Sequence, residues 1–123
     1  MPDSPVTELI DALVTAPLQR DPYRLVHELP RDVDALGLPD EDLRVLLAQR
    51  LRVTPDLVGD WQGYSWDKRW SSPYLDGTTE GLYDSGYRDV VKHPDHVSAC
   101  AAFIVRELAW MRERRRADPG RNR

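Results

Sequence analysis

Apolar residues recur with helical spacing from the start of the chain. Ser4 and Pro5 form a helix start signal, because serine caps helix N-termini and proline suits the first helical turn. The apolar residues that follow have the i, i+3, i+4, i+7, i+8 spacing of an amphipathic helix: Val6, Leu9, Ile10, Leu13 and Val14. We therefore expect a first helix that begins at Pro5 and ends at Pro17.

Residues 21–58 repeat this pattern in shorter pieces. Asp21-Pro22 predicts a short helix through about Leu29, with Pro30 as its end. One more turn is expected from Arg31 to Leu38, before a third helix that starts at Pro39. Thr54-Pro55 predicts a short fourth helix that ends near Val58.

The C-terminal stretch from Pro94 to Arg116 contains, after Pro94 itself, the longest run without glycine or proline. At about 100° per residue, one stripe of this helix is apolar. That stripe contains Val97, Ala101, Ile104, Leu108 and Met111, with Cys100 and Val105 at its edges. Phe103 and Trp110 lie well off the stripe, so two faces need covering. We expect this helix to be central and the remainder to pack around it.

Residues 61–91 differ in character, because they hold seven of the ten aromatic residues and four of the seven glycines. Turn signals at Asp76-Gly77 and Ser85-Gly86 separate short strand-like runs at 73–75, 82–84 and 87–91. These runs predict an antiparallel meander, reached through an irregular aromatic loop, with one face on the last helix. The expected fold is mainly α with a small antiparallel β meander (α+β), with four or five helices around the long C-terminal helix. Residues 1–116 are expected to form one domain, and residues 117–123 a disordered tail.

Charge is distributed unevenly along a chain of net charge −4. Residues 1–60 hold 12 acidic and 6 basic side chains, whereas residues 101–123 hold 3 acidic and 7 basic ones. The acidic front favours a basic protein partner and argues against nucleic acid. A single cysteine excludes an internal disulfide, and no leader or membrane-spanning run is visible, so a cytoplasmic protein is expected. An uncovered apolar side on the first or last helix would allow a homodimer.

The aromatic segment is the leading candidate for a binding surface. It interleaves rings with charges, and Trp, Tyr and Arg concentrate binding energy in protein interfaces. The candidate partner-binding residues are Trp61, Tyr64, Trp66, Lys68, Arg69, Trp70, Tyr74, Tyr83, Tyr87 and Arg88. The alternative is that these rings form a second core.

Motifs for catalysis are missing from the sequence, which contains no phosphate-cradling glycine loop, nucleophile elbow or H-E-x-x-H motif. We therefore assign no catalytic residue, metal or cofactor, and lean against an enzyme. The function expected is non-catalytic protein binding by a small acidic module. An inhibitor or immunity-type protein for a basic enzyme would be one form of it.

Two alternatives remain open. Residues 47–61 resemble a DNA-binding helix-turn-helix, with Ala48, Val53, Val58 and Trp61 at its small and apolar positions. Arg52 stands where a turn glycine is usual, and the second helix would expose Asp56 and Asp60 to phosphate. The second alternative is a metal-binding protein or enzyme that uses His93, His96 and Cys100, whose spacing matches no standard zinc signature.

Overall fold

The computed structural model describes residues 4–21, 23–68 and 72–117, with side chains through residue 114, and its fold is α+β. The mainly helical fold with a small antiparallel meander is therefore confirmed. In chain order the elements are α1 (Pro5–Val14), α2 (Ala16–Gln19), the π-helical turn η1 (Arg24–Glu28), α3 (Leu29–Leu36), α4 (Asp40–Val53), α5 (Asp56–Asp67), β1 (Pro73–Asp76), β2 (Thr79–Tyr83), β3 (Tyr87–Lys92) and α6 (His96–Ala117).

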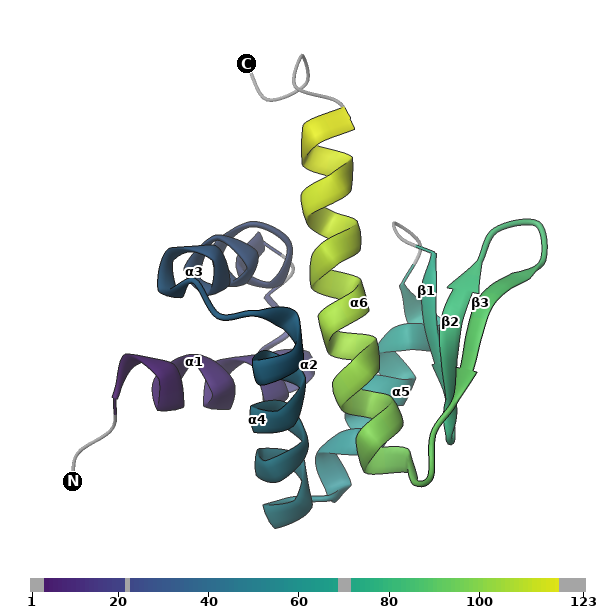
Figure 1. Ribbon diagram of the computed structural model, residues 1–123, viewed down its shortest axis with the longest axis horizontal. Helices are drawn as coiled ribbons and strands as arrows, with labels where there is room; N and C mark the ends of the chain where they lie inside the picture. The colour runs from purple at the N-terminus through teal and green to yellow at the C-terminus, as the bar shows by residue number, and fades with distance from the viewer. Residues whose placement is uncertain (1–3, 22, 69–71, 118–123) are drawn as a thin grey trace.

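The long C-terminal helix is central, as its apolar pattern predicts. Figure 1 shows α6 between the helices α1, α3 and α4 on one side and the sheet on the other. It contacts α3, α4, α5, β1 and β2. The whole predicted stripe is buried, and so is Phe103 on a second face, which packs toward Trp61 of α5. Because α6 is apolar on two faces, both of these faces must be covered by other elements.

The sheet has the strand order β1-β2-β3, and both pairs are antiparallel. The first turn comes at the predicted dipeptide, where Gly77 has a φ of +63° that glycine adopts without strain. Leu75 and Glu80 are paired across β1 and β2 and both are buried on the side of α6. The sheet therefore has an inner face toward α6 and an outer face away from it.

Three predicted helix limits are wrong. Pro17 and Pro30 do not end helices, because each lies in the first turn of a new helix, where its missing N–H costs nothing. The fourth helix does not stop at Val58 but runs to Asp67 as α5, so the expected aromatic loop is largely helical. Its buried side repeats at helical spacing through Leu57, Trp61 and Ser65, while Gly59 and Gly63 lie on the exposed side.

No helix in the described part of the chain is long and apolar enough to cross a membrane. The predicted tail begins at Ala117, which is the last residue of α6, and its remainder, residues 118–123, lies outside the described residues.

Candidate functional site

Part of the predicted binding surface lies in the interior. Trp61 is buried, its indole Nε1 donates a hydrogen bond to the Val14 carbonyl (3.1 Å), and its ring meets those of Tyr64 and Phe103 edge-on. Tyr74 is buried as well. For both residues the expectation of an exposed ring is wrong. Trp61 belongs to the core, because large rings supply much of the core of a small domain, whereas Tyr74 lies outside the core cluster and against the Tyr87 ring.

Lys68 also lies in the interior, although a lysine beside aromatic residues is typical of the solvent-exposed edge of a binding surface. Only 2% of its side chain is exposed, and its amine lies 3.8 Å from Glu107 Oε1, which is equally buried. The amine donates a hydrogen bond to the Pro73 carbonyl, and the Tyr64 hydroxyl donates one to Glu107. Burial lowers the pKa of Lys68, and the Glu107 carboxylate partly offsets that effect. Lys68 and half-buried Tyr64 thus fix α5 to α6 and β1.

The remaining predicted residues divide into exposed and undescribed ones. Trp66, Tyr83, Tyr87 and Arg88 are exposed. Arg69 and Trp70 lie outside the described residues. Trp66 lies on α5, whereas the other three exposed residues lie on the adjacent strands β2 and β3. The exposed part of the predicted surface is therefore concentrated on the sheet.

The outer face of the sheet is apolar where an antiparallel sheet with one solvated face usually carries polar residues. Side chains alternate between the two faces, so the partners Tyr83 and Tyr87 lie opposite to the inward Glu80 and Leu82. Lys92 pairs with Thr79 and shares the outer face, and Val90 lies two residues before it. Tyr83, Tyr87 and Val90 are 54%, 63% and 49% exposed.

The outer tyrosines touch one another. The Tyr87 ring meets Tyr83 at 4.9 Å and Tyr74 at 5.2 Å between centroids, both edge-on. Tyr74 lies opposite Gly81, whose lack of a side chain leaves room on this face. Burial raises the pKa of Tyr74. We call Tyr74, Tyr83 and Tyr87 the tyrosine cluster.

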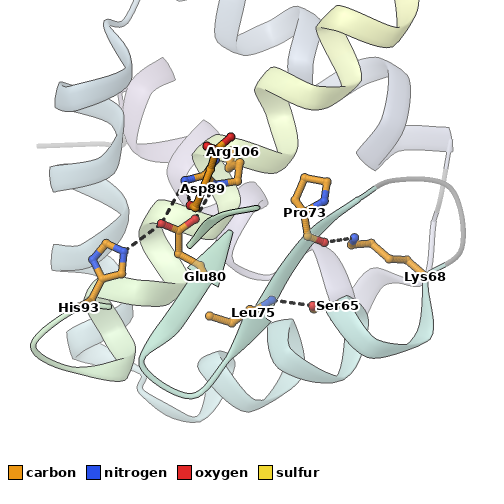
Figure 2. Close-up of polar contacts among 8 residues, drawn as sticks. All are labelled: Ser65, Lys68, Pro73, Leu75, Glu80, Asp89, His93 and Arg106. Carbon is orange, nitrogen blue, oxygen red and sulfur yellow. Dashed lines mark hydrogen bonds and ion pairs between the residues drawn. The ribbon is translucent and has the colours of Figure 1, made fainter. Parts of the chain in front are cut away.

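The inner face carries a buried charge in place of an apolar residue. Glu80 accepts hydrogen bonds from Arg106 of α6, at 2.6 Å to its Oε1, and its Oε2 lies 3.1 Å from His93 Nε2 (Figure 2). Arg106 also donates to the Asp89 carbonyl at 3.4 Å. These contacts satisfy the carboxylate and tie β2, β3 and α6 together, so this cluster positions the sheet.

The structure gives no support to a metal or thiolate site at His93, His96 and Cys100. His93 faces Glu80, His96 is exposed, and Cys100 is buried in the core. Burial raises the pKa of the Cys100 thiol well above its ordinary value, which disfavours the thiolate. Among the described side chains, no group of three or more His, Cys, Asp or Glu is placed to hold a metal ion.

The helix-turn-helix alternative fits the α4–α5 pair only in part. Ala48, Val58 and Trp61 are buried as that motif requires, but Val53, its apolar turn position, is 77% exposed. From Asp56 to Asp67 the exposed side of α5 carries carboxylates and no basic residue. Such a surface repels the phosphate backbone, so DNA binding stays a prediction without structural support.

Sequence reasoning missed how the two sheet edges differ. The Leu75 N–H donates to Ser65 Oγ (2.8 Å), and the Gly77 N–H donates to Gln62 Oε1 (2.7 Å). Together with Lys68, these α5 residues recur every third position, a spacing that places them along one helix face. That signal becomes readable once the segment is recognised as a helix.

Comparisons of the chain with protein-family models, with curated proteins and with solved structures found no match.

Proposed function

We propose that this protein is a non-catalytic protein-binding module that holds its partner on the outer face of the sheet. The observation that carries the proposal is the inverted polarity of that face, where Tyr83, Tyr87 and Val90 meet solvent while charged Glu80 points inward. Exposed aromatic residues supply much of the binding energy of protein interfaces, and contacts within the cluster limit the freedom they lose on binding.

The charge of the helical half supports a basic partner. Residues 1–60 hold twice as many acidic as basic side chains, and a negative surface speeds encounter with a positive one. An inhibitor or immunity-type protein for a basic enzyme would combine such a charge with a small aromatic contact surface. A cytoplasmic location and a homodimer remain expectations from the sequence.

The test compares two sets of tyrosine substitutions of the same chemistry. The wild-type protein is immobilised, the proteins that it retains from a lysate of its own source cells at moderate salt are identified, and their affinities are measured. Replacing Tyr83 and Tyr87 by serine should weaken binding about 30-fold, the size of an interface hot spot. The control is Tyr23→Ser, which removes an equally exposed tyrosine from the helical half and should leave binding unchanged.

The proposal is wrong if the double variant binds the retained protein as tightly as the wild type does. It is also wrong if the wild type retains no protein at micromolar concentrations. A salt dependence of the association rate reports separately on the charge of the partner.

A further inference from the structure

One edge of the sheet is closed by side chains of α5. The β1 backbone meets Ser65 through the Leu75 N–H and Lys68 through the Pro73 carbonyl (Figure 2), and Gln62 accepts from the Gly77 N–H in the turn that follows. These bonds occupy the groups that an added strand would need. A partner strand therefore has no access to β1.

The opposite edge is open. β3 is the edge strand, and all six of its residues are exposed. The His93 N–H donates to the Thr78 carbonyl (2.8 Å), so the backbone of His93 faces β2. In an antiparallel ladder, the backbone N–H and C=O groups of consecutive residues face alternate sides of the strand. The groups of Lys92 therefore face the open side, and so do those of Val90, two residues earlier.

A second copy of this chain fits the open edge poorly. When two β3 strands pair antiparallel, residues that face outward pair with each other. Centring the pair on Lys92 places two ammonium groups opposite each other, and like charges directly opposite destabilise a sheet. Centring it on Val90 sets the bulged residues of both copies side by side, where each strand interrupts the ladder of the other, so the occupant is a different chain.

The charges along the edge describe that chain. Asp89, Val90 and Val91 lie between Arg88 and Lys92, and the bulge sets Asp89 and Val90 opposite a single residue of a neighbouring strand. A complementary strand therefore has two apolar residues in the middle and acidic residues at both ends. Arg88 pairs with Asp84 at 3.6 Å, but both side chains are more than half exposed, so a partner carboxylate can replace Asp84 at little cost. The bulge at Asp89, where φ is +53°, restricts pairing to strands that tolerate it.

We propose that an extended segment of the partner protein adds to β3 as a fourth, antiparallel strand, with two apolar residues between acidic residues that meet Lys92 and Arg88. The inference rests on the proposed protein-binding function and specifies its binding mode. It concerns the local charge of the pairing segment, which is independent of the net charge of the partner. The added strand lies beside the tyrosine cluster, so the rings and the edge form one continuous surface.

The first test uses synthetic peptides and the whole protein. The probe is the peptide Thr-Glu-Val-Val-Glu-Thr with blocked ends, whose glutamates have the three-residue spacing that separates the β2 partners of Lys92 and Arg88, and the control carries lysine in place of both glutamates. We expect the acidic peptide to bind about tenfold more tightly, because two attractive cross-strand pairs become repulsive in the control. Binding should slow amide hydrogen exchange at Val90 and Lys92 and leave the Leu75 amide, on the closed edge, unchanged.

Backbone pairing is tested by methylating single peptide nitrogens. Methylation at the second valine removes an N–H that faces β3, so binding should be lost, whereas methylation at the first valine removes one that faces away. On the protein, Lys92→Pro and Lys92→Gln both remove the charge, but the proline also removes the outward N–H and should bind more weakly than the glutamine variant. The peptide pair keeps the test valid if Lys92→Pro does not fold.

Strand addition is wrong if the acidic peptide shifts no β3 amide resonance at millimolar concentration, or if the two methylated peptides bind equally. If the natural partner still requires Tyr83 and Tyr87 in that case, protein binding by the sheet face stands and the binding mode alone fails. If neither the tyrosines nor the edge matter, both proposals fail together.

Discussion

Lys68 and Glu107 show how a single residue can be misread from its neighbours in the sequence. Lys68 follows a carboxylate and an aromatic run, which is typical of a solvated segment. In the fold the Lys68 Nζ lies 5.7 Å from the centroid of the Phe103 ring. The same amine contacts the Glu107 carboxylate and donates to the Pro73 carbonyl. These partners lie 5 and 39 positions away, so local pattern alone predicts no burial.

Removing one member of this pair should be strongly destabilising. Glu107→Ala leaves the Lys68 amine buried without its carboxylate, and breaking a buried pair in this way costs about 3–5 kcal/mol. Urea unfolding at pH 7 measures the loss. The double variant Lys68→Met/Glu107→Leu should recover most of it, because well-packed apolar residues replace both charges. Wild-type stability of Glu107→Ala would contradict the burial of the pair.

Asp95 gives a prediction with a defined pH window. Its Oδ1 accepts a hydrogen bond from the Ser98 N–H (2.7 Å) at the start of α6, and that bond holds the pKa of Asp95 below its ordinary value of 3.8. The folded pKa is lower than the unfolded one, so the stabilisation is complete above pH 3.8 and is lost as the pH falls through the folded pKa.

Asp95→Asn tests this sign, because asparagine keeps the acceptor but does not titrate. We expect its melting temperature to fall less steeply than that of the wild type between pH 4 and pH 2. Asp95→Ala, which loses the cap altogether, should be less stable than the wild type at pH 7. A steeper acid dependence in Asp95→Asn would contradict the assigned hydrogen bond.

Among the elements, those with strong periodicity were predictable and those with mixed composition were not. The stripe of α6 follows from apolar spacing, and the turns of the meander follow from the Asp76-Gly77 and Ser85-Gly86 dipeptides. α5 was missed because Gly59, Gly63 and its aromatic residues suggest an irregular loop, whereas burial of Trp61 and Ser65 stabilises a helix. Tertiary packing overrides weak local propensity in this segment.

Glycines in β2 and α5 should respond to alanine in opposite ways. A Cβ at Gly81 would lie 3.0 Å from the Arg88 carbonyl oxygen and from Val90 Cα, which are backbone atoms of the bulge. Gly81→Ala should therefore destabilise the protein by about 1–3 kcal/mol. A Cβ at Gly63 meets nothing within 4 Å, so Gly63→Ala should stabilise α5 by about 0.5–1 kcal/mol.

Both variants are compared by urea unfolding, and each is a control for the other because the chemical change is identical. Equal effects of the same sign would mean that the bulge does not press on Gly81. Amide exchange in β3 should also rise in Gly81→Ala and stay constant in Gly63→Ala.

On the scale of the whole molecule, α6 joins a helical half to a sheet. Its last turns reach back to the acidic front, where Arg112 pairs with Asp34 at 2.9 Å. The sequence indicated that part of the aromatic segment is exposed, as Tyr83 and Tyr87 are, but it did not distinguish these rings from buried Trp61 and Tyr74. Which edge of the sheet is open could not be predicted, because it depends on long-range contacts between α5 and β1.

Because α6 packs against both the helical half and the sheet, we predict that the two halves unfold together, as one domain over residues 1–116. Leu43 of α4 and Leu75 of β1 are both fully buried in the core cluster that includes α6 residues. Truncating either to alanine should cost about 2–5 kcal/mol. Helical circular dichroism and the β2 amide signals in NMR should report the same shifted midpoint for each variant. If Leu75→Ala instead melts the sheet while the helical signal persists, α6 does not couple the halves. The tyrosine cluster would then lie on a separately unfolding unit, and its rings would not be held rigidly for a partner.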